Sequence, residues 1–362
     1  MYAYLGHAYA AIDEASEGNE LVAAQCRALM TGYASQYIDA NSEFEIVEIE
    51  KVYTAPLRNL DPKGRISRKW TMAGKIDKLV KINGEHYLVD HKTTSLEIAD
   101  PSSMYWRTLR IESQPRHYEI LLYSNGIPLR GIVWDVVKKP TTKPLKLTQA
   151  VRNNAMSTGL YLGETLSDQT FSSLTVLERE NMEMYSIRLI KDILEKRDKY
   201  FQRKPIALTT DELEQYNVSL WQASDDMART MKRTEKTGAT PYNPSGCMMY
   251  NTPCQYLGIC SNHDTVDGPS WESGGDVHPE LDGEAKPDGK RQLLTNSRVK
   301  CFQLCPTKHH YRYVLGLEKA DEALKPALFF GNVWHTAMDA WWAAVSGYER
   351  SNHDGNESEG EN

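Results

Sequence analysis

The sequence predicts an α/β protein, because a helical segment at the start of the chain is followed by several strands and a further helix. Apolar residues in 21–33 recur at the spacing of one helix face. Residues 45–53 alternate between apolar and polar, as a half-buried strand does. The length of 362 residues allows one sizeable domain or two small ones. More strands are expected at 76–82, 87–90 and 131–137, and an amphipathic helix at 182–201.

A tight hairpin brings two carboxylates and a lysine together. An Asn-Gly turn at 83–84 joins the strand that contains Asp77 to the strand that ends with Asp90 and Lys92. In an antiparallel hairpin Asp77 and Asp90 lie close enough to share a hard divalent cation. Side chains repeat every second residue along a strand, so Lys92 lies on the same face as Asp90. This grouping suits phosphodiester cleavage by an activated water, although charged hairpin ends are also common at solvated sheet edges.

A second polar pair follows the hairpin. Gln114 and Tyr118 stand four residues apart, which places them on one face of a helix. Gly-x-x-Asp ending at Asp77, Asp-x-Lys from Asp90 and Gln-x-x-x-Tyr together resemble the PD-(D/E)XK nuclease superfamily. Within it, the chain is most similar to the RecB-like exonucleases, including the CRISPR-associated four-cysteine nucleases and their phage relatives. The resemblance implies a restriction-endonuclease-like core, in which helices flank a central mixed sheet, with a four-cysteine Fe–S site.

The resemblance also implies roles for individual residues. Mg²⁺ or Mn²⁺ would be held by Asp77, Asp90, the backbone carbonyl of His91 and the imidazole of His335. Lys92 would orient the attacking water or neutralise charge that develops on the phosphate. The catalytic residues implied by the resemblance, including two that position Lys92 or the DNA backbone, are Asp77, Asp90, Lys92, Gln114 and Tyr118.

Two of the candidate residues have a competing interpretation. His335 lies in Gly-x-x-x-His, beginning at Gly331, but a lone histidine on a Trp-rich helix can also be a packed core residue. Glu50 is expected to be a solvent-facing strand carboxylate, and the alternative is an acid that supports the metal ligands from behind.

Three of the six cysteines, Cys247, Cys254 and Cys260, fall in a short loop rich in turn formers. Residues 1–30 lack a basic start followed by an apolar run, so no secretory signal is expected and the compartment is predicted to be the reducing cytoplasm. There, clustered cysteines bind metal more often than they form disulfides. Cys26 lies in an apolar-periodic helix and is expected to be a buried small residue.

The resemblance supplies a fourth ligand for this triplet. Cys305, in Phe-x-x-Cys-Pro followed by Tyr-x-Tyr, matches the early cysteine of the four-cysteine nucleases. The implied [4Fe–4S] ligands are Cys247, Cys254, Cys260 and Cys305. A Zn²⁺ site is the alternative, and Cys301, one helical turn before Cys305, could replace it as a ligand.

The order of these motifs differs from that of the resembled family, in which the Cys-Pro phrase and the Gly-x-x-x-His helix open the domain. Here both follow the other motifs. We therefore expect a circularly permuted nuclease, and the alternative is a composite of two incomplete copies. The predicted organisation is a core at 1–260, a disordered acidic linker at 261–293, a segment at 294–349 that packs on the core as the family's N-terminal part does, and an acidic disordered tail at 350–362.

Charge is unevenly distributed along the chain. Residues 261–290 carry eight acids and two lysines, and residues 351–362 carry four acids and no base. Without these segments, at −6 and −4, the formal charge of −7 becomes +3, which is compatible with DNA binding. Basic residues after the helix expected at 182–201, among them Arg203, are interpreted as a solvated helix face, and a phosphate track is the alternative.

These observations favour a metal-dependent DNA exonuclease that acts on single strands or duplex ends. Phage or bacterial recombination, repair or CRISPR adaptation, with a possible helicase partner, would be its setting. The alternatives are a non-catalytic Fe–S nucleic-acid-binding module, another two-carboxylate metal hydrolase, and an inactive composite. No membrane partner is expected, because no apolar run approaches the length of a membrane span.

Overall fold

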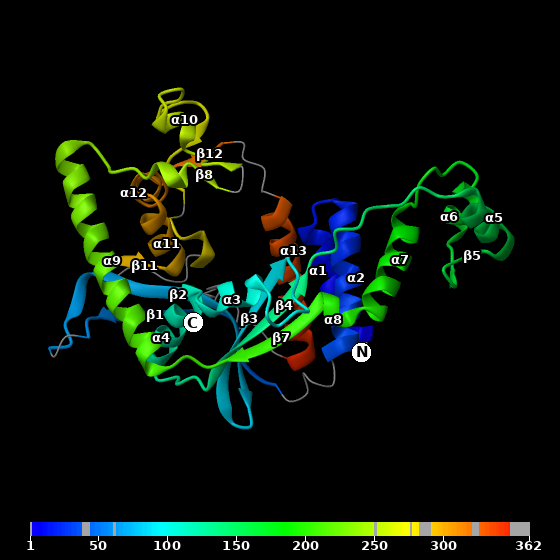
Figure 1. Cartoon of the computed structure of the whole chain (residues 1–362), viewed down its shortest axis with the longest axis horizontal. Helices are drawn as coiled ribbons and strands as arrows, with labels where there is room; N and C mark the ends of the chain where they lie inside the picture. Colours follow the sequence, from blue (N-terminus) through cyan, green and yellow to red (C-terminus); the bar gives the residue numbers. More distant parts are fainter. Residues whose placement is uncertain are drawn as a thin grey trace, which may run out of the picture.

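The computed structural model describes residues 2–37, 44–60, 63–249, 252–275, 277–281, 291–320 and 326–347. Their centre is a six-stranded mixed sheet with the order β1-β2-β3-β4-β7 and with β11 added to β2 (Figure 1). The β3–β4 and β11–β2 pairs are parallel and the others antiparallel. The strands are β1 (Glu45–Arg58), β2 (Ile66–Ile82), β3 (Glu85–Thr94), β4 (Gly131–Lys138), β7 (Phe201–Ile206) and β11 (Gln292–Leu294). The predicted α/β class and mixed sheet are confirmed.

The β2–β3 hairpin forms for the reason that its sequence suggests. Asn83 and Gly84 both have positive φ, 53° and 82°, as a two-residue type I′ turn requires. This turn fixes the register, so that Ile82 pairs with Glu85 and Lys78 with Val89. The positions of the candidate residues on the two strands follow directly from this short local element.

Helices cover both faces of the sheet, and β4 shows how the faces alternate. Ile132, Trp134 and Val136 pack toward α3 (Met104–Arg110) and α4 (Ser113–Ser124). Val137 packs instead against the other helical layer, which consists of α1 (Tyr2–Ala15), α2 (Glu20–Tyr37), α7 (Met182–Glu195) and α13 (Pro326–Ser346). On the first face lie also α9 (Thr210–Thr237) and α11 (Asn296–Leu304), which pack against β1 and β2. None of the described helices is long and apolar enough to cross a membrane.

A small module follows β4 and extends away from the sheet beyond α7 (Figure 1). Its apolar side chains, among them Leu147, Tyr161 and Leu174, form a separate cluster with Met184 of α7. Its elements are α5 (Gln149–Thr158), β5 (Leu160–Tyr161), β6 (Glu164–Thr165) and α6 (Asp168–Ser173). The helix predicted at 182–201 ends earlier, at Glu195. The rest of the predicted range forms the short helix α8 (Arg197–Tyr200) and the first residue of β7.

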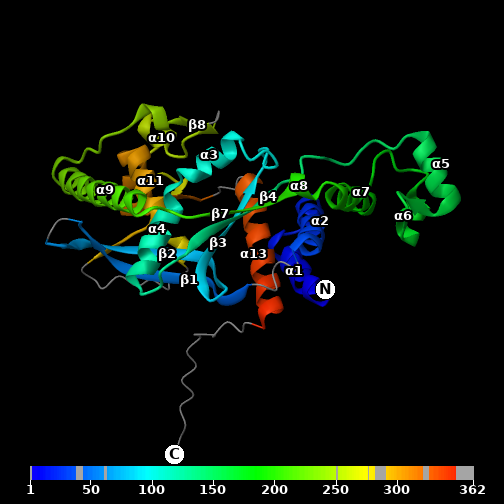
Figure 2. The ribbon, with the colours of Figure 1, turned by 60° about the horizontal axis from the view of Figure 1, so that its bottom comes forward.

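The C-terminal segment is built into the same sheet and core. β11 pairs with Trp70–Met72 of β2, and Arg298 of α11 lies 4.8 Å from the Trp70 ring centroid while donating to the Leu293 carbonyl at 2.9 Å. On the other face, α13 packs along α1 and α2, and Figure 2 shows it between the sheet and these two helices. Residues far apart in the sequence therefore share one folded body.

The segment predicted as a disordered linker, 261–293, contains folded elements in its described residues, which are 261–275, 277–281 and 291–293. β10 (Trp271–Glu272) pairs with β12 (Glu318–Lys319), and η3 (Pro279–Leu281) follows. Trp271 and Leu281 are 8% and 1% exposed, because segments distant in sequence supply their apolar partners. Composition could not reveal this, since two large apolar residues are enough to dock a polar segment. Residue 276, residues 282–290 and the tail predicted at 350–362 lie outside the described residues.

Candidate active site

Asp77 and Asp90 lie on facing strands at the centre of the sheet. Because Lys78 pairs with Val89, Asp77 and Asp90 are the next residues on β2 and β3. Asp90 is 2% exposed, and the Oδ2 atom of Asp77 accepts a hydrogen bond from the His91 amide at 2.8 Å. The structure thus brings together the two carboxylates that the hairpin predicts.

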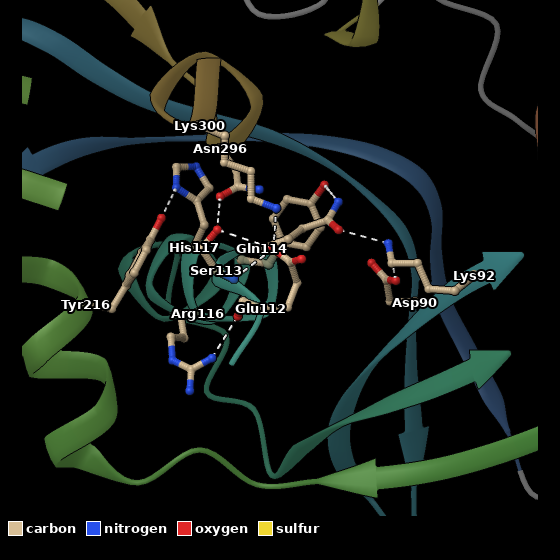
Figure 3. A network of polar contacts seen from close by, with 11 residues as sticks. Asp90, Lys92, Glu112, Ser113, Gln114, Arg116, His117, Tyr216, Asn296 and Lys300 are labelled. Atoms are coloured by element: carbon tan, nitrogen blue, oxygen red, sulfur yellow. Dashed lines mark hydrogen bonds and ion pairs between the residues drawn. The ribbon is translucent and has the colours of Figure 1, made fainter. Parts of the chain in front are cut away.

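A chain of polar contacts leads from Asp90 to α4 (Figure 3). The Lys92 ammonium lies 2.6 Å from Asp90 Oδ2 and donates to Gln114 Oε1 at 2.8 Å. The amide of Gln114 in turn donates to the Tyr118 hydroxyl at 2.9 Å. Gln114 and Tyr118 share a helix face, as their spacing predicts, and they hold Lys92 in place.

Gly74, the glycine of Gly-x-x-Asp, makes this arrangement possible. A Cβ atom at this position would lie 2.8 Å from Cε1 of Tyr118, closer than real Cβ contacts allow. The lack of a side chain therefore lets the Tyr118 ring lie directly against β2. The packing of Tyr118 therefore requires glycine at position 74.

The electrostatics of the pair follow from burial and close charges. Burial, followed by repulsion from Asp77, raises the pKa of Asp90 to about 6, although Lys92 opposes the shift. Burial tends to lower the pKa of Lys92, but Asp90 and Asp77 outweigh it, so the pKa of Lys92 is raised. Lys92 is thus a protonated donor at neutral pH, which suits charge stabilisation rather than proton abstraction.

His335 reaches Asp77 from the helical layer. Its Nδ1 atom lies 3.9 Å from Asp77 Oδ2, and its side chain is 36% exposed, so it is not a packed core residue. Burial tends to raise the pKa of Asp77, but the nearby His335, Lys92 and His91 outweigh burial and lower it. A carboxylate with a low pKa beside an accessible imidazole is suited to binding a cation.

The imidazole of His91 lies near His335, with 6.3 Å between the two ring centroids. His91 is 3% exposed, and its Nδ1 atom lies 3.4 Å from Asp135 Oδ2. Burial and the nearby Lys78 lower the pKa of His91 to about 4, so its ring is neutral. The main chain of His91 contacts the candidate site through the amide that donates to Asp77, and the carbonyl role that the resemblance implies stays a prediction.

Glu50 lies beside Asp77 and His335, contrary to the solvent-facing position that its strand pattern predicts. The residues on either side of it pair with Lys78 and Ile76, so Glu50 lies opposite Asp77 on β1. Its φ is +50°, a strained value for a non-glycine residue and one often found at functional sites. One ligand atom from each of Glu50, Asp77 and His335 lies within 4.8 Å of the other two. Glu50 is therefore not a solvent-facing strand carboxylate.

The environment of Glu50 supports this placement. Burial and Asp77 raise its pKa to about 7, while Lys75, 3.2 Å away, opposes the shift. Two carboxylates, an imidazole and the adjacent Asp90 form the mixture of oxygen and nitrogen donors that Mg²⁺ and Mn²⁺ accept. The residues present therefore fit a divalent cation.

Comparison with known proteins agrees with this geometry. The family model described as the PD-(D/E)XK nuclease superfamily matches residues 2–261 and 294–360. The chain belongs to the PD-(D/E)XK nuclease superfamily. No curated protein and no solved structure matches it. Members of the superfamily are usually nucleases, and the central mixed sheet flanked by helices agrees with this membership.

In this PD-(D/E)XK protein the predicted cysteines approach one another. The Cys254 amide donates to the Cys247 carbonyl at 2.8 Å. The Asn243 amide lies 3.4 Å from Cys305 Sγ, and the Asn243 carbonyl lies 3.9 Å from Cys247 Sγ. Burial raises the pKa of Cys260, and Cys254, Cys305 and Cys247 raise it further because they are close. Thiolates are the donors of Fe–S and zinc sites, but no group of three or more cysteines in the described residues has ligand atoms within 4.8 Å of one another, so a bound cluster stays a prediction.

The other two cysteines differ from each other. Cys301 lies near the end of α11 and is 9% exposed, and burial raises its pKa to about 11. Its neighbours include Cys305 and Cys254, so it stays an alternative ligand. Cys26 is completely buried in the helical layer, as predicted.

Proposed function

We propose that this protein is a metal-dependent deoxyribonuclease of the RecB-like branch, acting as an exonuclease on single strands or duplex ends. The observation that carries the proposal is the Asp90–Lys92–Gln114–Tyr118 contact chain beside the Glu50, Asp77 and His335 donors. A protein that only binds DNA has no need for a lysine that is held in one position between a buried carboxylate and an amide. Bacterial or phage recombination, repair or CRISPR adaptation, with a helicase as a possible partner, is the proposed setting.

The roles of the residues follow from their positions. Asp77, Glu50, His335 and Asp90 would hold Mg²⁺ or Mn²⁺, with the His91 carbonyl as the main-chain contribution that the resemblance implies. When bound, the cation supplies Lewis acidity to the phosphodiester and lowers the pKa of water. Protonated Lys92 donates to the attacking water or to a phosphate oxygen on which charge develops. Gln114 fixes the direction of the lysine, and Tyr118 fixes the orientation of the Gln114 amide.

A digestion assay tests the function. Purified protein would be incubated with end-labelled single-stranded DNA, linear duplex and closed circular DNA in Mg²⁺, Mn²⁺ or EDTA. An exonuclease shortens the linear substrates progressively and leaves closed circles intact, and EDTA stops it. Cleavage of closed circles would instead favour an endonuclease. Binding without cleavage in either metal would favour the non-catalytic module or an inactive composite.

We also propose that residues 294–349 take the place of the family's N-terminal part in a permuted domain. Three contacts support this: β11 extends the sheet beside β2, α13 brings His335 to Asp77, and the Asn243 side chain donates to the Leu304 carbonyl at 2.8 Å. The segment thus contributes to the sheet, the candidate active site and the cysteine group.

Replacement of Cys305 by serine is expected to remove an iron cluster. We propose that Cys247, Cys254, Cys260 and Cys305 hold a [4Fe–4S] cluster, so the anaerobically purified parent should contain about four iron and four sulfide ions per chain. Loss of one thiolate ligand should lower both contents by more than about half, measured by iron and sulfide analysis and by visible absorption.

Cys301→Ser is the matched control, because Cys301 lies one helical turn away and is similarly buried. It should keep its iron. Loss of iron in Cys301→Ser but not in Cys305→Ser would make Cys301 the fourth ligand. Zinc without sulfide in the parent protein would replace the cluster by a zinc site.

A further inference from the structure

A cavity of about 540 Å³, lined mostly by polar and charged residues, adjoins the far end of the catalytic contact chain. Gln114 and Tyr118 line it, so the cavity begins where the residues that hold Lys92 end. Its other walls come from β2, η3, α11, α13 and the π-helical turn η4 (His310–Val314). We propose that this cavity binds one nucleotide of single-stranded DNA next to the scissile phosphate, and that Arg312 pairs with a phosphate of that nucleotide. The proposal rests on the deoxyribonuclease function and adds the path of the substrate.

Charge favours a phosphodiester as the occupant. Three cationic residues line the cavity, and two of them already have partners: Lys75 pairs with Glu50 at 3.2 Å and Lys300 pairs with Glu112. Arg312 is exposed and has no hydrogen bond or ion pair within the described part of the chain. The planar fork of a guanidinium matches two phosphate oxygens, so Arg312 is the available anion-binding group.

The acid in the cavity wall is already engaged. Glu280 accepts a hydrogen bond from the Ser297 hydroxyl at 3.0 Å and lies 3.4 Å from His278 Nδ1. Burial tends to raise its pKa, but these partners outweigh burial and lower it. The Glu280 carboxylate is thus partly neutralised by its own partners, so it repels a bound anion less than a free carboxylate would.

Size and surface favour a single strand. Cavities of roughly 300–1,000 Å³ hold one small organic ligand. A duplex, whose major groove alone is about 12 Å wide, is too wide to enter such a cavity. Leu328, which is 54% exposed, adds an apolar surface against which a base or sugar can pack. Such a contact tolerates any base, as a nuclease without sequence preference requires.

The cavity wall is also fixed to the catalytic chain (Figure 3). The Ser113 hydroxyl donates to Asn296 Oδ1 at 2.8 Å, and Lys300 pairs with Glu112, so α11 is anchored to the first turn of α4. Arg312 itself lies in a π-helical turn, a rare geometry that often occurs at functional sites. A nucleotide bound here would thus have a defined position relative to Lys92.

Binding of a 5′-fluorescein-labelled twelve-residue oligo-dT, measured by fluorescence anisotropy, tests the proposal. The full chain with Asp90→Asn serves as the parent, so that the probe stays intact. Adding Arg312→Gln should weaken binding about 10-fold and reduce the slope of log affinity against log salt by about 0.7, the value for one phosphate contact on a single strand. Adding Arg312→Lys should cost less than the glutamine change, because it keeps the charge.

Lys191→Gln is the matched control, because it also removes one exposed cation but lies on α7, outside the cavity. It should change affinity less than about twofold. Leu328→Glu places a negative charge in the cavity at an exposed helix position, and it should weaken binding at least as much as Arg312→Gln. Thermal melting of each variant identifies any that are unfolded.

The two proposals fail in distinguishable ways. If Arg312→Gln and Leu328→Glu both bind like Lys191→Gln, the cavity does not take the strand, and cleavage by the wild-type protein still supports the nuclease function. If the wild-type protein neither cuts nor binds DNA, the nuclease function and the proposed strand path are both wrong.

Discussion

Replacement of Asp90 by asparagine is expected to lower the rate of DNA cleavage at least about 1,000-fold while leaving the fold intact. Asp90 is 2% exposed and lies 2.6 Å from Lys92 Nζ, so its charge both orients the lysine and adds an oxygen donor beside Asp77. Metal-assisted charge stabilisation contributes several kcal/mol, and about 1.4 kcal/mol corresponds to a tenfold change in rate. Initial rates on end-labelled DNA in saturating Mn²⁺ measure the effect.

The control for this variant is Glu85→Gln, at the other end of the same strand. Glu85 is exposed and pairs with Arg130 at 3.2 Å, far from the contact chain, so its removal should change the rate less than about twofold. Circular dichroism and a thermal melt would verify the fold of both variants. Undiminished digestion by Asp90→Asn would show that the cleavage site lies elsewhere.

The part of the site that the sequence predicts correctly is the part that short-range structure determines. The two-residue turn at 83–84 sets the register of β2 and β3, so the closeness of Asp77 and Asp90 follows from local geometry. The helical spacing of Gln114 and Tyr118 is equally local. These contacts needed no knowledge of how the rest of the chain folds.

Glu50 shows why the rest could not be predicted. The register between β1 and β2 shifts between Ile46 and Glu48, and an irregularity of one residue moves every later side chain to the other face. Nothing in the alternating pattern of 45–53 reveals this shift. The place of Glu50 in the site therefore depends on the pairing of β1 with β2, which the sequence pattern does not reveal.

The position of Arg203 also differs from the one that its sequence pattern predicts. The sequence suggested an exposed basic helix end, but the residue lies on β7, and its side chain is 12% exposed and 3.2 Å from Asp135 on β4. The pair depends on which strands are neighbours, a long-range property that composition does not encode. Its guanidinium also lies 3.7 Å from the Tyr37 ring centroid, so the whole side chain belongs to the helical layer.

Replacement of Asp135 by asparagine is expected to lower the free energy of unfolding by about 3–5 kcal/mol, the usual cost of removing one partner of a buried ion pair. Asp135 is completely buried, accepts a hydrogen bond from the Tyr33 hydroxyl and pairs with Arg203 at 3.2 Å, with His91 3.4 Å away. Burial alone would raise its pKa, but Arg203 and His91 hold the pKa well below the usual range. Urea denaturation at neutral pH, followed by circular dichroism, measures the loss.

The matched control is Asp225→Asn, which removes an ion pair between two exposed residues, Asp225 and Arg229, on α9. Pairs of this kind contribute about 0.3–0.5 kcal/mol, so the two variants should differ by several kcal/mol although each loses one carboxylate charge. Equal stability of the two would mean that the Arg203 guanidinium finds solvent when Asp135 is removed. The expected difference would instead make Asp135 a structural support for β3. Asp135 lies 3.4 Å from the imidazole of His91, and the amide of His91 donates to Asp77 in the candidate active site.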